Sequence, residues 1–114
     1  MSRDPGLYCD DILQSIQKIE NFTSGMSLSG FRDDIKTQDA VIRNFEIIGE
    51  AVKNISEEIK KKYPEVSWRS AGDMRDFLIH EYPDVIIDIV WRAVVDDLPR
   101  FKDQISYVMK EEGL

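Results

Sequence analysis

The sequence is 114 residues long and 42% hydrophobic, which is enough for one packed domain and hardly enough for two. Its formal net charge of -7 argues against binding nucleic acid through a broad basic surface, although it leaves room for a local basic cleft. One cysteine excludes an intramolecular disulfide, and there is neither a signal-peptide stretch nor a run of roughly 18 to 20 apolar residues. We therefore expect a single domain, residues 1–114, in the cytoplasm and without membrane contact.

The N-terminal third predicts one long helix and one short helix. Apolar side chains recur at helical spacing in the first of them, at Tyr8, Ile12, Ile16 and Ile19. Turn-forming residues at 23–27 end this helix. Either Ser27 or Ser29 is placed to cap a short helix over residues 31–35.

The strongest helical pattern follows Thr37, a suitable N-cap, and runs to Tyr63 and Pro64, where the proline ends it. Its apolar stripe consists of Val41, Phe45, Ile48, Val52, Ile55 and Ile59. Flanking apolar residues widen this stripe, which predicts a central bundle helix. Gly49 in its middle costs about 1 kcal/mol relative to alanine, so we expect a neighbouring backbone to approach closely there.

Two more helical stretches complete the chain. One is expected over residues 68–82, between a cap at Ser67 and a stop at Pro83. Asp84 can cap the last stretch, which Pro99 should kink or restart. No strand-like alternation of useful length occurs, so the predicted fold class is all-α, an up-down bundle of four or five helices.

The residues best suited to chemistry lie on the expected helix 68–82. His80 is the single histidine, so acid–base work near neutral pH falls to it first. Asp76 lies one turn earlier and can orient or charge the imidazole. Arg75 is about 140° around an ideal helix from His80, so the two can flank a groove, and Tyr82 lies almost directly above Arg75. The structural alternative is a solvated helix face with an Asp76–His80 pair.

Other conspicuous residues have mainly structural interpretations. Leu78 and Ile79 are expected to face the core. The lysines at 60–62 are typical of a solvated helix end, where cations complement the dipole, with a basic cleft as the alternative. The aspartate pairs at 33–34 and 96–97 are better explained as solvated charge or caps than as magnesium ligands. One histidine and one cysteine cannot build a zinc site, so we expect neither metal nor cofactor.

RNA cleavage is the functional alternative that suits this residue set. A neutral imidazole takes the proton of a ribose 2′-hydroxyl, and the RNA thereby supplies its own nucleophile. Arginine holds the scissile phosphate with a planar, bidentate fork. The catalytic candidates are His80 as the base, Arg75 as the phosphate holder and Asp76 as a residue that tunes His80.

The spacing Arg75-x4-His80-x-Tyr82 resembles the signature of HEPN ribonucleases of the HepT type. The resemblance extends along nearly the whole chain, in the family's order, through Asp11-Ile12-Leu13, residues 22–26, 38–44, 47–51, 63–69, 74–82, Val90-Trp91 and Asp97-Leu98-Pro99. It implies a homodimeric helical bundle in which the two motifs face each other across a shared cleft. It also implies the toxin of a prokaryotic toxin–antitoxin pair, acting as a metal-independent ribonuclease on cellular RNA.

The resemblance further implies a partner, a minimal nucleotidyltransferase (MNT) antitoxin that silences the toxin by transferring AMP from ATP to Tyr82. Nucleotide phosphate at the cleft mouth would repel an RNA backbone. Asp76 stands where the family frequently has Asn, and a carboxylate there favours the imidazolium form of His80, which is a poorer base. The alternative function is a non-catalytic helical dimer that binds a nucleotidyltransferase partner, nucleotide or RNA.

Overall fold

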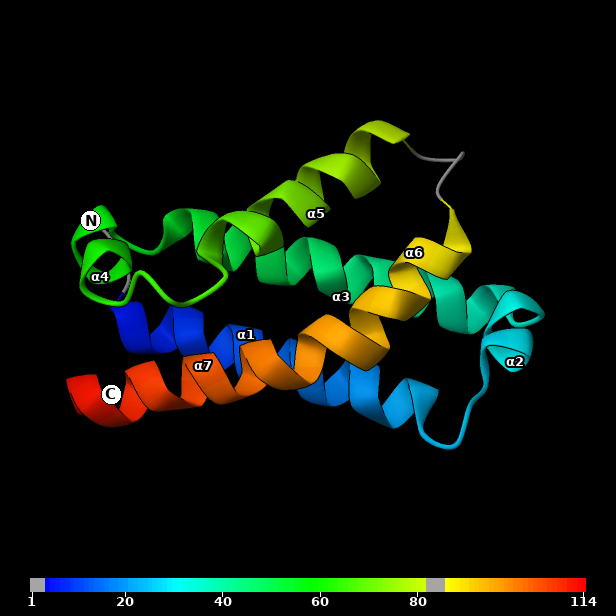
Figure 1. The fold of residues 1–114 in the computed structure, drawn as a ribbon, viewed down its shortest axis with the longest axis horizontal. Coiled ribbons are helices and arrows are strands. Elements are labelled where there is room, and N and C mark those ends of the chain that lie inside the picture. Colours follow the sequence, from blue (N-terminus) through cyan, green and yellow to red (C-terminus); the bar gives the residue numbers. More distant parts are fainter. Residues whose placement is uncertain (1–3, 82–85) are drawn as a thin grey trace.

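The computed structural model describes residues 4–81 and 86–114, and this part of the chain is helical without any strand. The elements in chain order are α1 (Pro5–Thr23), α2 (Leu28–Arg32), α3 (Ile35–Asn54), α4 (Glu57–Lys62), α5 (Trp68–Glu81), α6 (Ile87–Arg92), the π-helical segment η1 (Ala93–Asp97) and α7 (Leu98–Glu112). Because α6, η1 and α7 follow one another without a break, they form one long irregular helix (Figure 1). The all-α prediction is confirmed.

Helix α3 is the centre of the bundle, as its wide apolar stripe predicted. It packs against α1 on one side and α5 on the other, while α7 lies along α1 (Figure 1). The fully buried side chains come from these four helices and from α2 and α6, and they include Ile12, Ile16, Phe31, Val41, Leu78, Val90 and Ile105. No helix in the described ranges is long and apolar enough to cross a membrane.

Side chains of the 27–37 region cap the second and third helices. Ser27 caps α2 by accepting a hydrogen bond from the backbone N–H of Gly30 at 3.1 Å, one of the two alternatives predicted. The prediction that Thr37 caps the long helix is wrong. Asp34 is the N-cap of α3: it accepts hydrogen bonds from the N–H of Thr37 at 3.0 Å and from its hydroxyl at 2.7 Å. A carboxylate suits the positive end of the helix dipole, which explains why Asp34 takes the position.

The long helix expected to reach Pro64 is in fact two helices. It breaks at Ile55, whose backbone is extended, and Ser56 then caps α4 through the N–H of Ile59 at 3.3 Å. The lysines 60–62 occupy the last turn of α4, in agreement with the interpretation of a helix end. Beyond α4, the indole N–H of Trp68 donates to the carbonyl oxygen of Tyr63 at 3.0 Å and ties the connecting loop to α5.

The chain around Pro99 restarts as a helix, as predicted, through a segment of wider turns. The N–H of Leu98 bonds to the carbonyl of Ala93, five residues earlier, and Pro99 is the second residue of α7. Proline has no N–H and its ring crowds the preceding turn, and a π segment gives that turn more room. The predicted stop at Pro83 and cap at Asp84 lie outside the described residues, and α6 begins after Ile86 without a side-chain cap.

Candidate active site

Three of the four predicted site residues, Arg75, Asp76 and His80, lie on α5, whereas Tyr82 lies outside the described residues. The core contact of α5 is made by Leu78, which is fully buried. The prediction that Ile79 also faces the core is wrong, because its side chain is 43% exposed. Helical rotation carries Ile79 past the contact with α3 and leaves it on the same outer region of the helix as His80.

Close contact between α3 and α5 depends on Gly49. A Cβ atom at this position would overlap the Cβ of Arg75 and lie 2.9 Å from the carbonyl oxygen of Ala71. The absent side chain therefore lets the backbone of α5 lie directly on α3, the close approach that the sequence predicted. It also fixes the base of the Arg75 side chain against α3.

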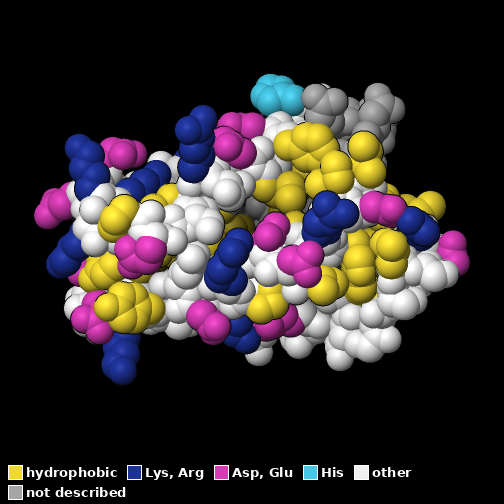
Figure 2. Space-filling model, viewed as in Figure 1, with side chains coloured by type: hydrophobic (Ala, Val, Ile, Leu, Met, Phe, Trp, Pro, Cys, Tyr) yellow, Lys and Arg dark blue, Asp and Glu magenta, His cyan; other side chains and the backbone are white. Residues whose placement is uncertain are grey.

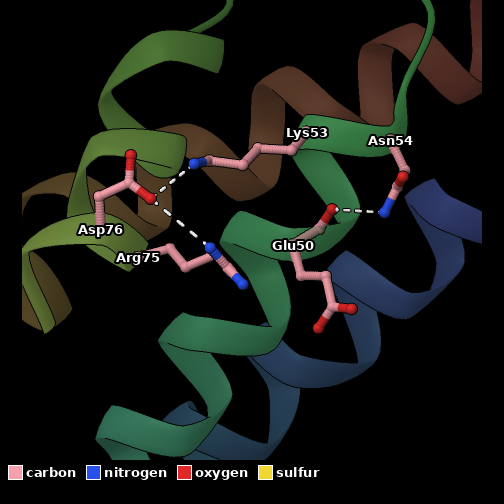
Figure 3. Close-up of polar contacts among 5 residues, drawn as sticks. All are labelled: Glu50, Lys53, Asn54, Arg75 and Asp76. Atoms are coloured by element: carbon pink, nitrogen blue, oxygen red, sulfur yellow. Dashed lines mark hydrogen bonds and ion pairs between the residues drawn. The ribbon is translucent and has the colours of Figure 1, made fainter. Parts of the chain in front are cut away.

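The Asp76 carboxylate is held between two cations (Figure 3). Its Oδ1 atom lies 2.5 Å from Nζ of Lys53, on α3, and 3.5 Å from the nearer terminal nitrogen of Arg75. The hydrogen bond from Lys53 is the main cause that lowers the pKa of Asp76 below its ordinary value, with Arg75 adding to it. The carboxylate is therefore ionised at neutral pH, and the three residues form a small network that joins α5 to α3.

Lys53 was not among the predicted site residues, and the sequence holds only part of the signal for it. It follows Gly49 by four residues, so both lie on the α3 face that α5 covers. The Lys53 side chain passes over Gly72 of α5 on its way to Asp76, with its Cε atom at 3.5 Å from the position of a Cβ there.

His80 lies on the surface near the C-terminal end of α5 (Figure 2). The predicted Asp76–His80 pair is not formed: within the described ranges, no hydrogen bond or ion pair joins the two side chains. His80 is still close enough to add a minor electrostatic contribution to the lowered pKa of Asp76. Arg75 is packed against α3 and partly exposed, whereas the His80 imidazole is open to solvent.

Hydrophobic side chains gather beside His80, over the end of α5 and over α6 (Figure 2). The large exposed hydrophobic residues of these two elements and of the position before α6 are Ile79, Ile86 and Ile89, which are 43%, 57% and 42% exposed. Such a cluster next to polar candidate residues is typical of a surface that a partner covers.

The two hollows found in the described structure do not include the candidate residues. One has a volume of about 120 Å³. It is lined by apolar residues that include Phe45, Ile48, Met74 and Phe101, and by the charged residues Asp97 and Arg100. The other lies between α1 and α3, beside Glu50 and Asn54. Neither is lined by Arg75 or His80. In residues 4–81 and 86–114, no group of three or more His, Cys, Asp and Glu side chains is placed to hold a metal ion.

The family model described as "Ribonuclease HepT-like" matches residues 12–108. The chain belongs to the HepT-like ribonuclease family. No solved structure was found to match it.

Two relatives match nearly the whole length of this HepT-like chain. A protein of Thermococcus cleftensis named "Probable ribonuclease HepT" is 43% identical over 110 residues, which cover 96% of this chain and 100% of that protein. A Methanocaldococcus jannaschii protein named "Gamma-glutamylcyclotransferase and putative RNase" is 40% identical over 111 residues. The match covers 97% of this chain but 50% of that longer protein.

Proposed function

We propose that the chain is a metal-independent endoribonuclease, with Arg75 holding the scissile phosphate and His80 acting as the general base. The observation that carries this proposal is that α5 presents both an arginine packed against α3 and an exposed imidazole. The HepT-like family model and the ribonuclease names of the relatives support the same activity.

The proposed reaction uses few groups. The His80 imidazole takes the proton of the ribose 2′-hydroxyl, and the 2′-oxygen attacks the adjacent phosphorus. The bond from phosphorus to the 5′-oxygen of the next nucleotide breaks, which leaves a cyclic 2′,3′-phosphate, and the departing 5′-oxygen takes up a proton to become a 5′-hydroxyl. The Arg75 guanidinium stabilises the negative charge on the phosphate oxygens as the bond changes occur.

We also propose that the active unit is a homodimer. The departing 5′-oxygen needs a proton donor, and each chain has one histidine, so a second copy can supply the second imidazole. The exposed hydrophobic residues Ile79, on α5, and Ile86 and Ile89, at and in the start of α6, are suited to an interface between two copies. Pairing across this surface would bring two Arg75–His80 sets to one cleft.

The biological role we propose is that of the toxin in a prokaryotic HEPN/MNT toxin–antitoxin pair, acting on RNA in the cytoplasm. An MNT-type nucleotidyltransferase would be the antitoxin and would transfer AMP from ATP to Tyr82. Tyr82 follows His80 by two residues, so a nucleotide there would place negative charge next to the RNA path. The modification would lower activity by repelling the substrate.

The deciding experiment is cleavage of total tRNA and rRNA by the purified protein in EDTA, with His80→Ala assayed beside it. Cleavage by the wild-type protein alone supports a metal-independent ribonuclease with His80 as the base. Because His80 is exposed, the variant should keep its circular dichroism spectrum and melting temperature. Intact mass spectrometry first excludes protein that already carries AMP on Tyr82.

The second candidate function is a helical module that binds a nucleotidyltransferase, nucleotide or RNA without cleaving it. The net charge of -7 and the ion pair between Arg75 and Asp76 favour it, because both reduce the attraction of the site for phosphate. RNA binding without cleavage by either the wild-type protein or His80→Ala would support this candidate over the ribonuclease.

A further inference from the structure

The side chain that determines where Asp76 points comes from another helix. Lys53 Nζ donates a hydrogen bond to Asp76 Oδ1 at 2.5 Å, across the contact between α3 and α5. Figure 3 shows the Lys53 side chain extending from α3 across to this carboxylate on α5. Arg75 reaches the same oxygen from within α5, at 3.5 Å. Both cations therefore hold the carboxylate on the α3 side of α5.

The direction in which Asp76 points matters because His80 is its neighbour one turn later. Side chains four residues apart on a helix lie within reach of each other, and an unpaired carboxylate there attracts an imidazolium. An imidazolium has no free electron pair and cannot accept the proton of a ribose hydroxyl. An unpaired aspartate at this position would therefore reduce the fraction of neutral imidazole near pH 7, an effect that a cation bound to the carboxylate offsets.

We propose that Lys53 is a positioning residue that neutralises the Asp76 carboxylate and keeps it on the α3 side of α5, so that the His80 imidazole stays available as a base. This inference rests on the proposed ribonuclease function and adds a residue from α3 to its site. Lys53 acts through Asp76 and touches neither the imidazole nor the bond that breaks.

The other charged groups along this contact do not replace Lys53. On α3, Glu46 lies 3.7 Å from Arg43, an ion pair within the helix. Glu50 extends away from Asp76 in Figure 3, and its backbone carbonyl accepts a hydrogen bond from Asn54 at 3.0 Å. On α5 itself, Arg75 is the one other cation bound to Asp76 among the described residues, and it lies farther from the carboxylate than Lys53 does.

The first test follows the titration of His80 directly. Because the chain has one histidine, the imidazole ring protons give a single titrating set of signals in proton NMR. In Lys53→Met, the midpoint of this titration should move to higher pH by about 0.3 unit, the size expected for an exposed pair one helical turn apart. Lys53→Arg should restore the wild-type midpoint, and Lys18→Met, which removes an exposed lysine of α1, should not move it.

A double-variant cycle separates this role from a merely structural one. When Asp76 is replaced by Asn, there is no carboxylate for Lys53 to hold. The double variant Asp76→Asn/Lys53→Met should therefore have the same His80 titration midpoint as Asp76→Asn alone. A midpoint that moves equally in both backgrounds would mean that Lys53 acts on His80 without Asp76. A midpoint that does not respond to Lys53→Met at all would also overturn the proposal.

RNA cleavage provides the second readout. The acid limb of the kcat/KM profile should move to higher pH by the same 0.3 unit in Lys53→Met, which lowers the rate about twofold below the midpoint and leaves the plateau unchanged. A loss of kcat/KM at every pH, not cancelled by Asp76→Asn, would instead show that Lys53 binds the RNA phosphate itself and would overturn the proposal. If the wild-type protein cleaves no RNA, the proposed function fails while the NMR titration still decides whether Lys53 governs Asp76.

Discussion

Gly49 and Arg75 lie so close together that a methyl group on residue 49 would occupy the space of the Arg75 Cβ atom. The contact joins the middle of the central helix to the first residue of the candidate motif. Gly49 lets the backbones of α3 and α5 touch, and it therefore also determines where the Arg75 side chain starts. A change at Gly49 should therefore affect both the packing of α5 on α3 and the position of Arg75.

Gly49→Ala should lower the free energy of unfolding by about 1–3 kcal/mol, since the methyl group overpacks the contact with α5 by more than alanine gains in helix propensity. Urea denaturation followed by circular dichroism measures the change. Gly72→Ala is the matched control on α5, because a Cβ there meets Lys53 only at ordinary contact distances of 3.5 and 3.8 Å. The control should be neutral or should stabilise the protein by up to about 1 kcal/mol. Equal effects of the two variants would contradict the role assigned to Gly49.

Arg75→Lys should lower kcat for RNA cleavage by about 100-fold or more while the protein stays folded. Lysine keeps the charge but loses the planar fork that holds two phosphate oxygens, and one lost donor at a developing charge costs about this much. Steady-state cleavage of a short RNA in EDTA measures the loss. Arg69→Lys changes an arginine on the same helix whose side chain is 95% exposed, and its rate should match the wild type. A fully active Arg75→Lys would remove Arg75 from the proposed mechanism.

The C-terminal end of α7 should make stability depend on pH. Glu112 accepts hydrogen bonds from Lys62 at 2.7 Å and from the Tyr63 hydroxyl at 2.5 Å, and its side chain is 18% exposed. Lys62 first, and then Tyr63, lower the pKa of Glu112 below its ordinary value of 4.5. A lowered carboxyl pKa in the folded state contributes stability above pH 4.5, and this contribution is lost as the pH falls through the folded-state pKa.

Glu112→Gln should therefore lower the free energy of unfolding at pH 7, because glutamine loses the charge that Lys62 and the Tyr63 hydroxyl bind. The difference from the wild type should shrink as the pH falls below 4.5 toward the lowered folded-state pKa of Glu112. Thermal melts of both proteins at pH 7 and pH 3 test this. Glu111→Gln changes the neighbouring exposed carboxylate and should have little effect at either pH. A gap for Glu112→Gln that persists at pH 3 would argue against the ionised carboxylate as its source.

Ile89→Asp should prevent dimer formation and abolish RNA cleavage together. A carboxylate in an apolar interface must be desolvated without a partner, which costs more than such a surface contact gains. Sedimentation equilibrium measures the association state and the EDTA cleavage assay measures activity. Ile35→Asp is the control, because Ile35 is 70% exposed at the start of α3, on a different element from the hydrophobic cluster beside His80. A monomeric variant that remains active would show that one copy suffices for the reaction.

The helices themselves were largely predictable from local sequence, because apolar spacing and capping residues act over a few positions. The central helix, the break after residue 23 and the cap at Ser27 follow from such signals. The predicted cap at Thr37 failed because Asp34, three residues earlier, offers a carboxylate that accepts from both the backbone and the side chain of Thr37. Two good capping residues one turn apart cannot be ranked by spacing alone.

The candidate site was predictable to a similar extent. The sequence alone determined that Arg75, Asp76 and His80 share one helix, since helical periodicity is a local property and the order of the residues is given. It also determined that Gly49 needs a close neighbour, because a glycine inside a helix is otherwise unfavourable. These inferences required no knowledge of which helices pack together.

Only the tertiary structure decided which residue neutralises Asp76. Within α5, His80 is the neighbour that the sequence offers Asp76, and their pair was the structural alternative. The fold instead brings Lys53, 23 residues away in the chain, to 2.5 Å from the carboxylate. The same packing turned Ile79 outward beside His80 and left it 43% exposed. Pairing between helices depends on their relative rotation and axial position, and these are determined by how the whole core fills space rather than by any single segment.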